Sequence, residues 1–416
     1  MQREFLKNLI FNNLSQGMQF GSRWIFNLIL ISLLTDYDFG VFAYILALAN
    51  ILMGILPFGS TTFLLGDVDP EDRVRQLGRT IALICFLFLI SIIIYLILLP
   101  FQIEHYDLLI YGILLGLVYS LNLILFFFLK SIGRFKEEIK ASAILLGVTV
   151  MILVYFYFGI DKLTIPMIFG FAIVSNLAVA LFMFFSKYIP TTILLNEIRK
   201  SFFIPFQLIK ERLYFGLQEL MTTSYTQIGL FVMFYFMDPE VYGIFRKIFI
   251  VIAPILLFVV TFSQVLLYHL KKAADEQVVT EFRKYLRLMG VAATIIMIGM
   301  WFFKPIILET VGKLELSAEL SKAYVLVVIA VGVRFLFVNY EMLLVRFGKQ
   351  HLRFWVMFAA MVVNFLTIVT LTPLFGLMGA VLVDLITNAT ILAGLAIVAE
   401  RQIKKFNLNH SHLTKL

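Results

Sequence analysis

Apolar residues run along this chain in long stretches, separated by short polar segments that hold most of its charge. Lipid offers no hydrogen-bond partner to backbone groups, so a segment that crosses it forms a helix or part of a closed barrel. Runs this long and continuous favour helices. With a window of roughly 19 residues, we predict about twelve spans, at approximately 9–34, 40–65, 80–100, 107–129, 141–160, 164–186, 212–236, 242–268, 287–308, 320–345, 353–373 and 376–399.

The composition places the chain in the same class. Hydrophobic residues make up 61% of it and charged residues 14%, with a mean hydropathy of +0.97, outside the range of soluble domains. The net charge of +8 fits cytoplasmic loops rich in Lys and Arg, so no nucleic-acid partner is expected. Cys85 is the only cysteine and the histidines form no helical ligand pair, so we predict neither a metal site nor a cofactor.

Basic residues are distributed unevenly between the two sets of predicted loops. One set, which includes both termini, holds nearly all the Lys and Arg near the membrane, whereas the other holds Lys162, Lys313 and Lys322. The positive-inside rule therefore predicts that both termini are cytoplasmic. Residues 1–8 lead directly into a helix without a small-residue cleavage site, so no removable signal peptide is expected.

The chain also divides into two similar halves. We predict an N-terminal lobe at 1–186, a cytoplasmic amphipathic connector at 187–211 and a C-terminal lobe at 212–416. The segment Asp36 to Phe42, before the second span, has an echo at Asp238 to Phe245, before the eighth. Six spans separate the two copies, so the repeats have parallel orientation.

The segment Leu34 to Tyr44, its echo at Asp238 to Phe245, and Pro373 to Ala380 before the last span resemble the polysaccharide flippases of bacterial inner membranes. These proteins are O-antigen flippases of the multidrug/oligosaccharidyl-lipid/polysaccharide superfamily, active in lipopolysaccharide synthesis. The resemblance implies an all-α, MATE-like fold, with two six-helix lobes around a central cleft lined by spans 1, 2, 7 and 8. Many relatives carry an Asp in span 7 about where this chain has Gln227, so that acid is not carried over.

The resemblance also implies a function. The expected substrate is an undecaprenyl-diphosphate-linked oligosaccharide, carried across by alternating access while its lipid tail stays in the bilayer. Polysaccharide assembly proteins and membrane lipid are the expected partners, and coupling to H+ or Na+ is left open.

Polar residues interrupt two of the predicted spans in a regular pattern. Their spacing of three or four residues puts them on one helical face. In span 1 these residues are Asn12, Gln16, Gln19, Arg23 and Asn27, and in span 7 they are Glu219, Thr222, Thr223 and Thr226.

Charged residues inside the spans are mostly basic. Each one costs roughly 2.5 to 3.5 kcal/mol at the bilayer centre, which asks for a partner or a watery cavity. The basic excess suits an anionic substrate, and arginine matches a diphosphate through paired donors, so Arg23 is the first candidate for that contact. The alternatives are ion pairs between helices, snorkelling side chains, or acids that carry the coupling proton. The basic residues are Arg23, Arg246, Lys247, Lys304 and Arg334, and the acids are Glu219, Glu341 and Asp384.

Two other functions remain open. A multidrug or cation antiporter would have the same architecture, although the basic excess argues against an organic cation. A membrane enzyme of lipid-linked glycan assembly is the third hypothesis. We find no Gly-Lys-Ser/Thr phosphate loop, no His-Glu-x-x-His and no large extramembrane loop, so we predict that the chain is not an enzyme.

Overall fold

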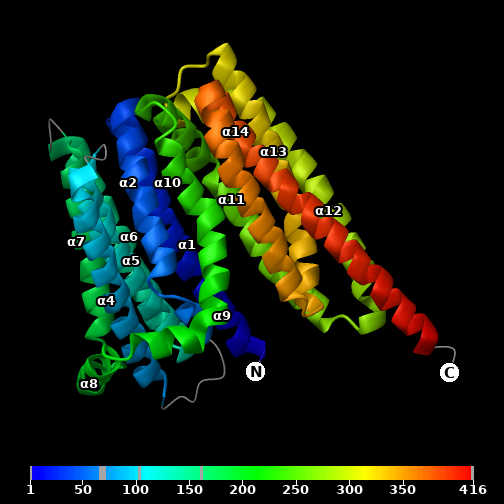
Figure 1. Ribbon diagram of the computed structural model, residues 1–416, viewed down its shortest axis with the longest axis horizontal. Helices are drawn as coiled ribbons and strands as arrows, with labels where there is room; N and C mark the ends of the chain where they lie inside the picture. Colours follow the sequence, from blue (N-terminus) through cyan, green and yellow to red (C-terminus); the bar gives the residue numbers. More distant parts are fainter. Residues whose placement is uncertain (1, 65–71, 102–104, 160–162, 414–416) are drawn as a thin grey trace. The chain divides into compact units, whose positions relative to one another are not determined.

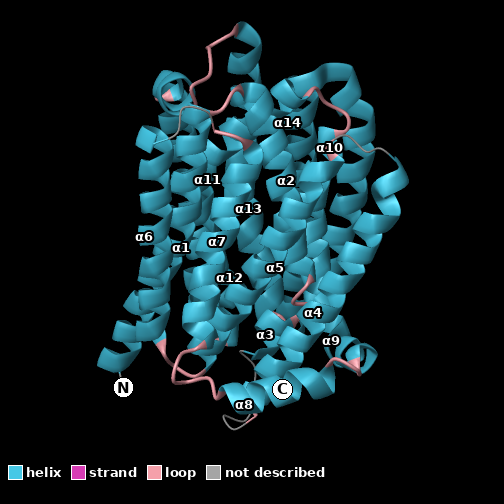
Figure 2. Ribbon diagram, turned by 90° about the vertical axis from the view of Figure 1, so that its left-hand side faces the viewer, coloured by secondary structure: helices cyan, strands magenta, loops and turns pink. Residues whose placement is uncertain are grey.

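The computed structural model describes residues 2–64, 72–101, 105–159 and 163–413. Over these ranges every regular element is helical, and the helices are joined by short loops (Figure 2). The predicted all-α class is therefore confirmed. By contacts between residues, the chain forms two compact units, residues 1–231 and 232–416, which are shown in sequence colours in Figure 1.

Unit 1 contains most of the helices. They are α1 (Gln2–Leu33), α2 (Asp36–Ile55), α3 (Ser60–Leu64), α4 (Arg73–Leu98), η1 (Leu99–Phe101), α5 (Tyr106–Ser131), α6 (Phe135–Gly159), α7 (Ile165–Phe184), α8 (Thr191–Ser201), α9 (Pro205–Thr223), the π-helical η2 (Ser224–Ile228) and the start of α10 (Gly229–Phe234). Unit 2 holds the end of α10, α11 (Pro239–Lys272), α12 (Asp275–Phe302), the π-helical η3 (Ile306–Val311), α13 (Ala318–Arg346) and α14 (Gln350–Leu413).

Nine helices in the described ranges are long and apolar enough to cross a membrane, against about twelve predicted spans. Composition and continuity explain the difference. Predicted span 1, in α1, carries the polar stripe, and predicted span 7 is divided among α9, η2 and α10. Predicted spans 11 and 12 are two helices that share the label α14 and meet at a kink at Gly376, so they count once.

Each copy of the sequence echo lies at the start of a helix, beside or at its N-cap. The Thr35 hydroxyl accepts a hydrogen bond from the backbone N–H of Asp38 at 3.1 Å, at the start of α2. The Asp238 carboxylate accepts one from the N–H of Glu240 at 3.0 Å, at the start of α11. Such caps satisfy backbone donors that have no partner within the helix. The repeated sequence therefore marks two equivalent helix starts.

The third motif shapes the sharp turn within α14. Pro373 lies just before Gly376, whose φ of 51° falls in the left-handed region that glycine adopts most readily. A Cβ at Gly379 would collide with the carbonyl oxygen of Leu371. The motif from Pro373 to Ala380 thus provides the close backbone approach that joins predicted spans 11 and 12.

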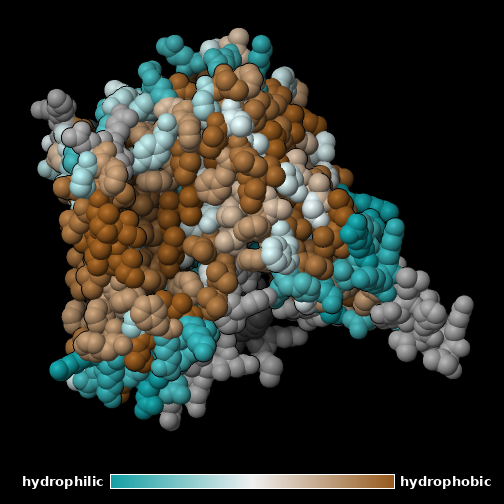
Figure 3. All heavy atoms as spheres, viewed as in Figure 1, coloured by the Kyte–Doolittle hydropathy of each residue, from teal (hydrophilic) through white to brown (hydrophobic). Residues whose placement is uncertain are grey.

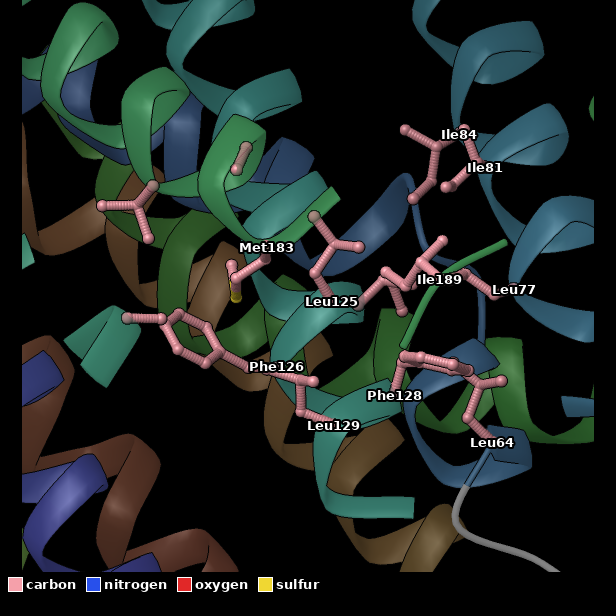
Figure 4. Packing of buried hydrophobic residues seen from close by; sticks show 14 of the residues in the cluster. Leu64, Leu77, Ile81, Ile84, Leu125, Phe126, Phe128, Leu129, Met183 and Ile189 are labelled. Atoms are coloured by element: carbon pink, nitrogen blue, oxygen red, sulfur yellow. The ribbon is translucent and has the colours of Figure 1, made fainter. Parts of the chain in front are cut away.

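Unit 1 has a continuous apolar core where α4, α5, α6, α7 and α8 meet (Figure 4). Phe128 is fully buried in it and Leu129 is nearly so. The outer face of α4 is apolar but exposed, since Leu96 and Ile97 are 59% and 61% accessible. Figure 3 shows a hydrophobic face with hydrophilic residues gathered at its ends. This pattern is what a bilayer requires of a protein surface.

Helix α9 packs against α2, α3 and α4 inside unit 1. We predicted this segment at the junction of the connector and the C-terminal lobe, so the compact units divide the chain later than the predicted lobes do. The division into an N-terminal lobe, a connector and a C-terminal lobe, at 1–186, 187–211 and 212–416, stays a prediction. In unit 2, α13 lies against α11, α12 and α14 (Figure 1).

Candidate functional site

Arg23 lies on α1, half-buried inside unit 1. Its guanidinium carbon stands 4.4 Å from the ring centroid of Tyr119 on α5, a cation–π distance. Its Nη1 also lies 3.6 Å from the sulfur of Met53. The Nε atom of Arg23 is buried and has no hydrogen-bond partner among the described residues. No carboxylate of the described residues forms an ion pair with the Arg23 guanidinium. The guanidinium therefore keeps donor capacity for a further group.

A small cavity adjoins Arg23 between α1, α5, α6 and α7. About 20 Å³ of it is open to a water-sized molecule, which is room for one water rather than a ligand. Its lining mixes hydroxyl, amide and aromatic groups without a carboxylate, and the hydroxyls of Ser22 and Thr149 lie 2.8 Å apart. The polar lining is Ser22, Arg23, Tyr119, Thr149, Ser175 and Asn176.

The remaining residues of the α1 stripe have different environments. Gln19 donates to the hydroxyls of Ser15 and Ser142, each at 3.0 Å, so its amide serves helix packing. Asn27 has a buried amide oxygen with no partner among the described residues, whereas Gln16 is half-buried. The side chain of Asn12 lies outside the described residues.

The sequence analysis missed a buried acid next to this stripe. Glu138 on α6 is fully buried, accepts a hydrogen bond from Ser15 at 2.8 Å and pairs with Lys130 at 3.3 Å. We predicted the fifth span to start at 141, which left Glu138 in a loop. Ser15 and Ser22 beside the polar stripe were the available signal that α1 faces another polar helix.

Glu219 on α9 binds the break between α2 and α3. Its carboxylate accepts hydrogen bonds from the backbone N–H of Gly59, at 2.8 Å, and from the Thr61 hydroxyl. Phe58 in this break has a φ of 42°, and Gly59 has a φ of 75°. A left-handed conformation costs roughly 1 to 2 kcal/mol for a residue with a side chain. Glu219 therefore holds a strained corner in place.

The sequence analysis also missed a buried basic residue on the same face of α9 as Glu219. Arg212 is fully buried and donates to the hydroxyls of Ser60, at 2.5 Å, and Thr80, at 2.9 Å. From the sequence it counted only as a loop charge, because it sits at the edge of the predicted span. Positions 212, 216, 219 and 223 recur at helical spacing along one face, and this face contacts the α2–α3 corner through Arg212 and Glu219.

The threonines of predicted span 7 lie at the junction of α9 and η2. Thr223 is buried against α2, and the Thr226 hydroxyl donates to the carbonyl of Thr223 at 3.4 Å. Gln227 falls in the π-helical turn and has a buried amide oxygen with no partner among the described residues. Short π-helical turns are frequent at functional sites. The side chain of Thr222 lies outside the described residues.

In unit 2, the structure joins two predicted site residues directly. Arg334 on α13 and Asp384 on α14 form an ion pair, with 2.6 Å between Nη2 and Oδ1. The amide of Asn388 bonds the backbone carbonyl of Asp384, not its carboxylate. Glu341, on α13 like Arg334, pairs instead with Arg353 on α14. Both acids thus link the same two helices.

The other predicted cations lie on α11 and just after α12. Arg246 and Lys247 are 9% and 2% exposed, and the Nε of Arg246 has no hydrogen-bond partner in the described part of the chain. Lys304 donates to the Ser321 hydroxyl at 2.7 Å and stands 5.3 Å from the Trp301 ring. Among the residues that the structure describes, no cluster of His, Cys, Asp and Glu could hold a metal ion.

No family model matches this chain, and no curated protein matches it. Solved structures do. The chain is similar to a multidrug resistance MATE family transporter in an inward-facing conformation, with 15% identity, 95% of each chain covered and a TM-score of 0.63. It is similar to the lipid II flippase MurJ in an inward closed conformation, with 14% identity, 96% of this chain and 90% of that one covered, and a TM-score of 0.68.

A third similar structure is a MOP superfamily transporter from Pyrococcus furiosus, described as having a binding pocket of reverse polarity. The identity is 15%, the coverage is 95% of this chain and 96% of that one, and the TM-score is 0.57. At such identities the likeness shows the fold. The predicted MATE-like, all-α fold is therefore confirmed.

Proposed function

We propose that this chain is a membrane transporter that flips an undecaprenyl-diphosphate-linked oligosaccharide, such as an O-antigen unit, across the bacterial cytoplasmic membrane. Alternating access of the two predicted lobes would expose the substrate first to one side and then to the other. The fold supports a transporter, because the similar structures are transporters and a lipid II flippase rather than enzymes. Both termini would be cytoplasmic, as the loop charges predict.

The observation that carries the proposal is that Arg23 is partly buried without an acidic partner. It is half-buried in unit 1, with no carboxylate in an ion pair with it among the described residues. An uncompensated arginine at membrane depth costs roughly 2.5 to 3.5 kcal/mol, and a phosphate that accepts paired hydrogen bonds would offset this cost. The described cavity holds about one water, so the diphosphate contact requires α1 to move away from α5, α6 and α7 within the N-terminal lobe.

The acids of unit 2 also favour an anionic substrate. Asp384 and Glu341 are each neutralised by an arginine, so these two pairs add no net negative charge. Arg246, Lys247 and Lys304 are the further basic residues that we propose for contact with the diphosphate or the sugar. Arg334 would contribute only if its pair with Asp384 opens, which is also how Asp384 would become available for H+ or Na+ coupling.

A multidrug or cation antiporter is the second candidate, and the likeness to the multidrug MATE transporter favours it. A site for organic cations needs acidic or aromatic groups to bind them. Tyr119 is an aromatic group near Arg23, but its ring face is already occupied by the guanidinium. The two functions therefore predict opposite effects of removing Arg23. Loss of the positive charge should impair anion transport and improve cation transport.

Complementation of a flippase-deficient strain tests the proposal. We expect Arg23→Ala to abolish complementation and Arg23→Lys to retain part of it, because lysine keeps the charge but lacks paired donors. Ser22→Ala is the matched control, since Ser22 lines the same cavity without a charge. Protein levels in the membrane must equal those of the wild type. A stable and fully active Arg23→Ala variant would refute the anion site, and export of cationic dyes by that variant would favour the antiporter.

A further inference from the structure

A larger cavity lies within unit 2, where the end of α13 meets both ends of α14. Its volume is about 590 Å³. The sharp turn at Gly376 returns α14 toward its own start, so Lys405, near its end, lines the same cavity as His351 in its first turn. The polar lining also includes Arg346 at the end of α13, Lys349 just before α14, Asp275 at the start of α12, and Gln402.

The cavity holds more positive than negative charge. Arg346 donates to the carbonyl of Leu270 at 2.8 Å and pairs with Asp275 at 2.7 Å, so the one acid of the lining is already neutralised. Lys349 and Lys405 have no ion pair among the described residues. Two lysines around one space repel each other unless an anion lies between them. The lining is therefore suited to a phosphate group.

The surface next to the cavity is that of a membrane interface. Trp355 lies one helical turn beyond His351 and is 62% exposed, and tryptophan is enriched at the level of lipid head groups. Further along the same helix, Val362, Leu366 and Val369 are 40%, 63% and 52% exposed. Their spacing places them on one apolar stripe that starts near Trp355. Figure 3 shows hydrophilic residues gathered at this end of unit 2.

We propose that this cavity binds the phosphate of an anionic membrane phospholipid, whose acyl chains lie along the exposed stripe of α14. Lys349 and Lys405 supply the positive charge, and Phe347 and Phe406, whose ring centroids are 5.3 Å apart, form a wall of the cavity. Basic pockets at the cytoplasmic ends of spanning helices commonly bind such head groups. The site lies outside the proposed substrate path at Arg23 and is independent of the transported molecule.

Native mass spectrometry of the full-length protein in detergent tests the site with three probes: phosphatidylglycerol, phosphatidylcholine and inorganic phosphate. We expect phosphatidylglycerol to bind at least tenfold more tightly than phosphatidylcholine. Lys349→Gln/Lys405→Gln should weaken phosphatidylglycerol binding about tenfold. The matched control, Lys284→Gln/Lys404→Gln, removes two exposed lysines outside the cavity and should change it less than twofold.

Three outcomes would overturn the proposal. Equal losses of phosphatidylglycerol binding in the two double variants would show that the effect depends only on net charge. Unchanged binding in both variants would exclude the cavity as the lipid site. Inorganic phosphate that competes at the same concentration as the lipid would assign the site to a soluble anion. Lys349→Arg/Lys405→Arg keeps both charges, so its retained binding would support the proposal even if the Gln variant misfolds.

Discussion

Arg334 and Asp384 form an ion pair at 2.6 Å that ties α13 to α14 in unit 2, and their side chains are 27% and 19% exposed. Removing one partner of a largely buried pair leaves a charge without compensation. We expect Asp384→Asn to lower stability by about 1 to 3 kcal/mol, and Arg334→Gln/Asp384→Asn to recover part of the loss. Thermal unfolding in detergent measures both.

The pair of Arg283 and Glu400 is the matched control, because it also joins helices of unit 2, at 2.7 Å, but is 45% and 34% exposed. We expect Glu400→Gln to cost under about 1 kcal/mol. If Asp384→Asn is as stable as the wild type but its transport no longer follows an H+ or Na+ gradient, Asp384 is a coupling acid and the pair is not structural.

The hydrogen bonds of Glu219 predict a structural role for this acid. Glu219→Gln keeps an oxygen that accepts from the N–H of Gly59 and an amide that can donate to Thr61, so we expect normal protein levels and unchanged gradient dependence. Glu219→Leu leaves the N–H of Gly59 without its acceptor, which costs about 1 to 3 kcal/mol. We expect lower protein levels for that variant. Glu211→Leu on the exposed side of α9 is the control.

Normal amounts of Glu219→Gln with gradient-independent transport would contradict this role. That result would assign proton or cation coupling to Glu219, which the sequence left open. Equal losses for Glu219→Leu and Glu211→Leu would show that α9 tolerates no leucine on either face, so the corner at Gly59 would not be the cause.

Helix starts and turns could be predicted because they depend on neighbours in sequence. Thr35 and Asp238 cap the helices that follow them, and the Pro373 to Ala380 motif fixes a turn through its own backbone. Buried charges could not be predicted in the same way. Arg212 and Glu138 lie at the edges of their spans, where a hydropathy window treats a basic or acidic residue as a loop, and their partners Ser60 and Ser15 lie far away in sequence.

The candidate site was predictable only in part for the same reason. Helical spacing placed the α1 stripe on one face, but it could not separate Gln19, which bonds to α6, from Arg23, which stacks on Tyr119. The pairing of Arg334 with Asp384 depends on the contact between α13 and α14. The π-helical turn at Gln227 has no sequence signal that we recognise.

The distribution of basic residues predicts which loops face the cytoplasm. In a Cys85→Ala background, we expect a cysteine at Glu240, exposed at the start of α11, to react with a membrane-impermeant maleimide added outside intact cells. A cysteine at Lys136, exposed at the start of α6, should react only after permeabilisation. The reverse pattern would invert the predicted topology, and equal labelling of both would mean mixed orientations.

Gly54 on α2 and Thr223 on α9 mark a close crossing of two helices. A Cβ at position 54 would collide with the Thr223 side chain, and overpacking of this kind typically costs about 1 to 3 kcal/mol. We therefore expect Gly54→Ala to lower the thermal stability in detergent. Gly54→Ala/Thr223→Ala should restore most of it, because alanine at 223 removes the hydroxyl and methyl groups that would collide and leaves only the Cβ close by.

Gly147→Ala on α6 is the matched control, since nothing lies within 4 Å of a Cβ there, and alanine in a helix interior is favoured over glycine by roughly 0.5 to 1 kcal/mol. This variant should be as stable as the wild type or more so. Thr223 is also a predicted polar residue of the substrate path. A double variant that is fully stable but inactive would assign its hydroxyl to transport, whereas a stable Gly54→Ala single variant would show that α2 and α9 do not cross this closely in the membrane.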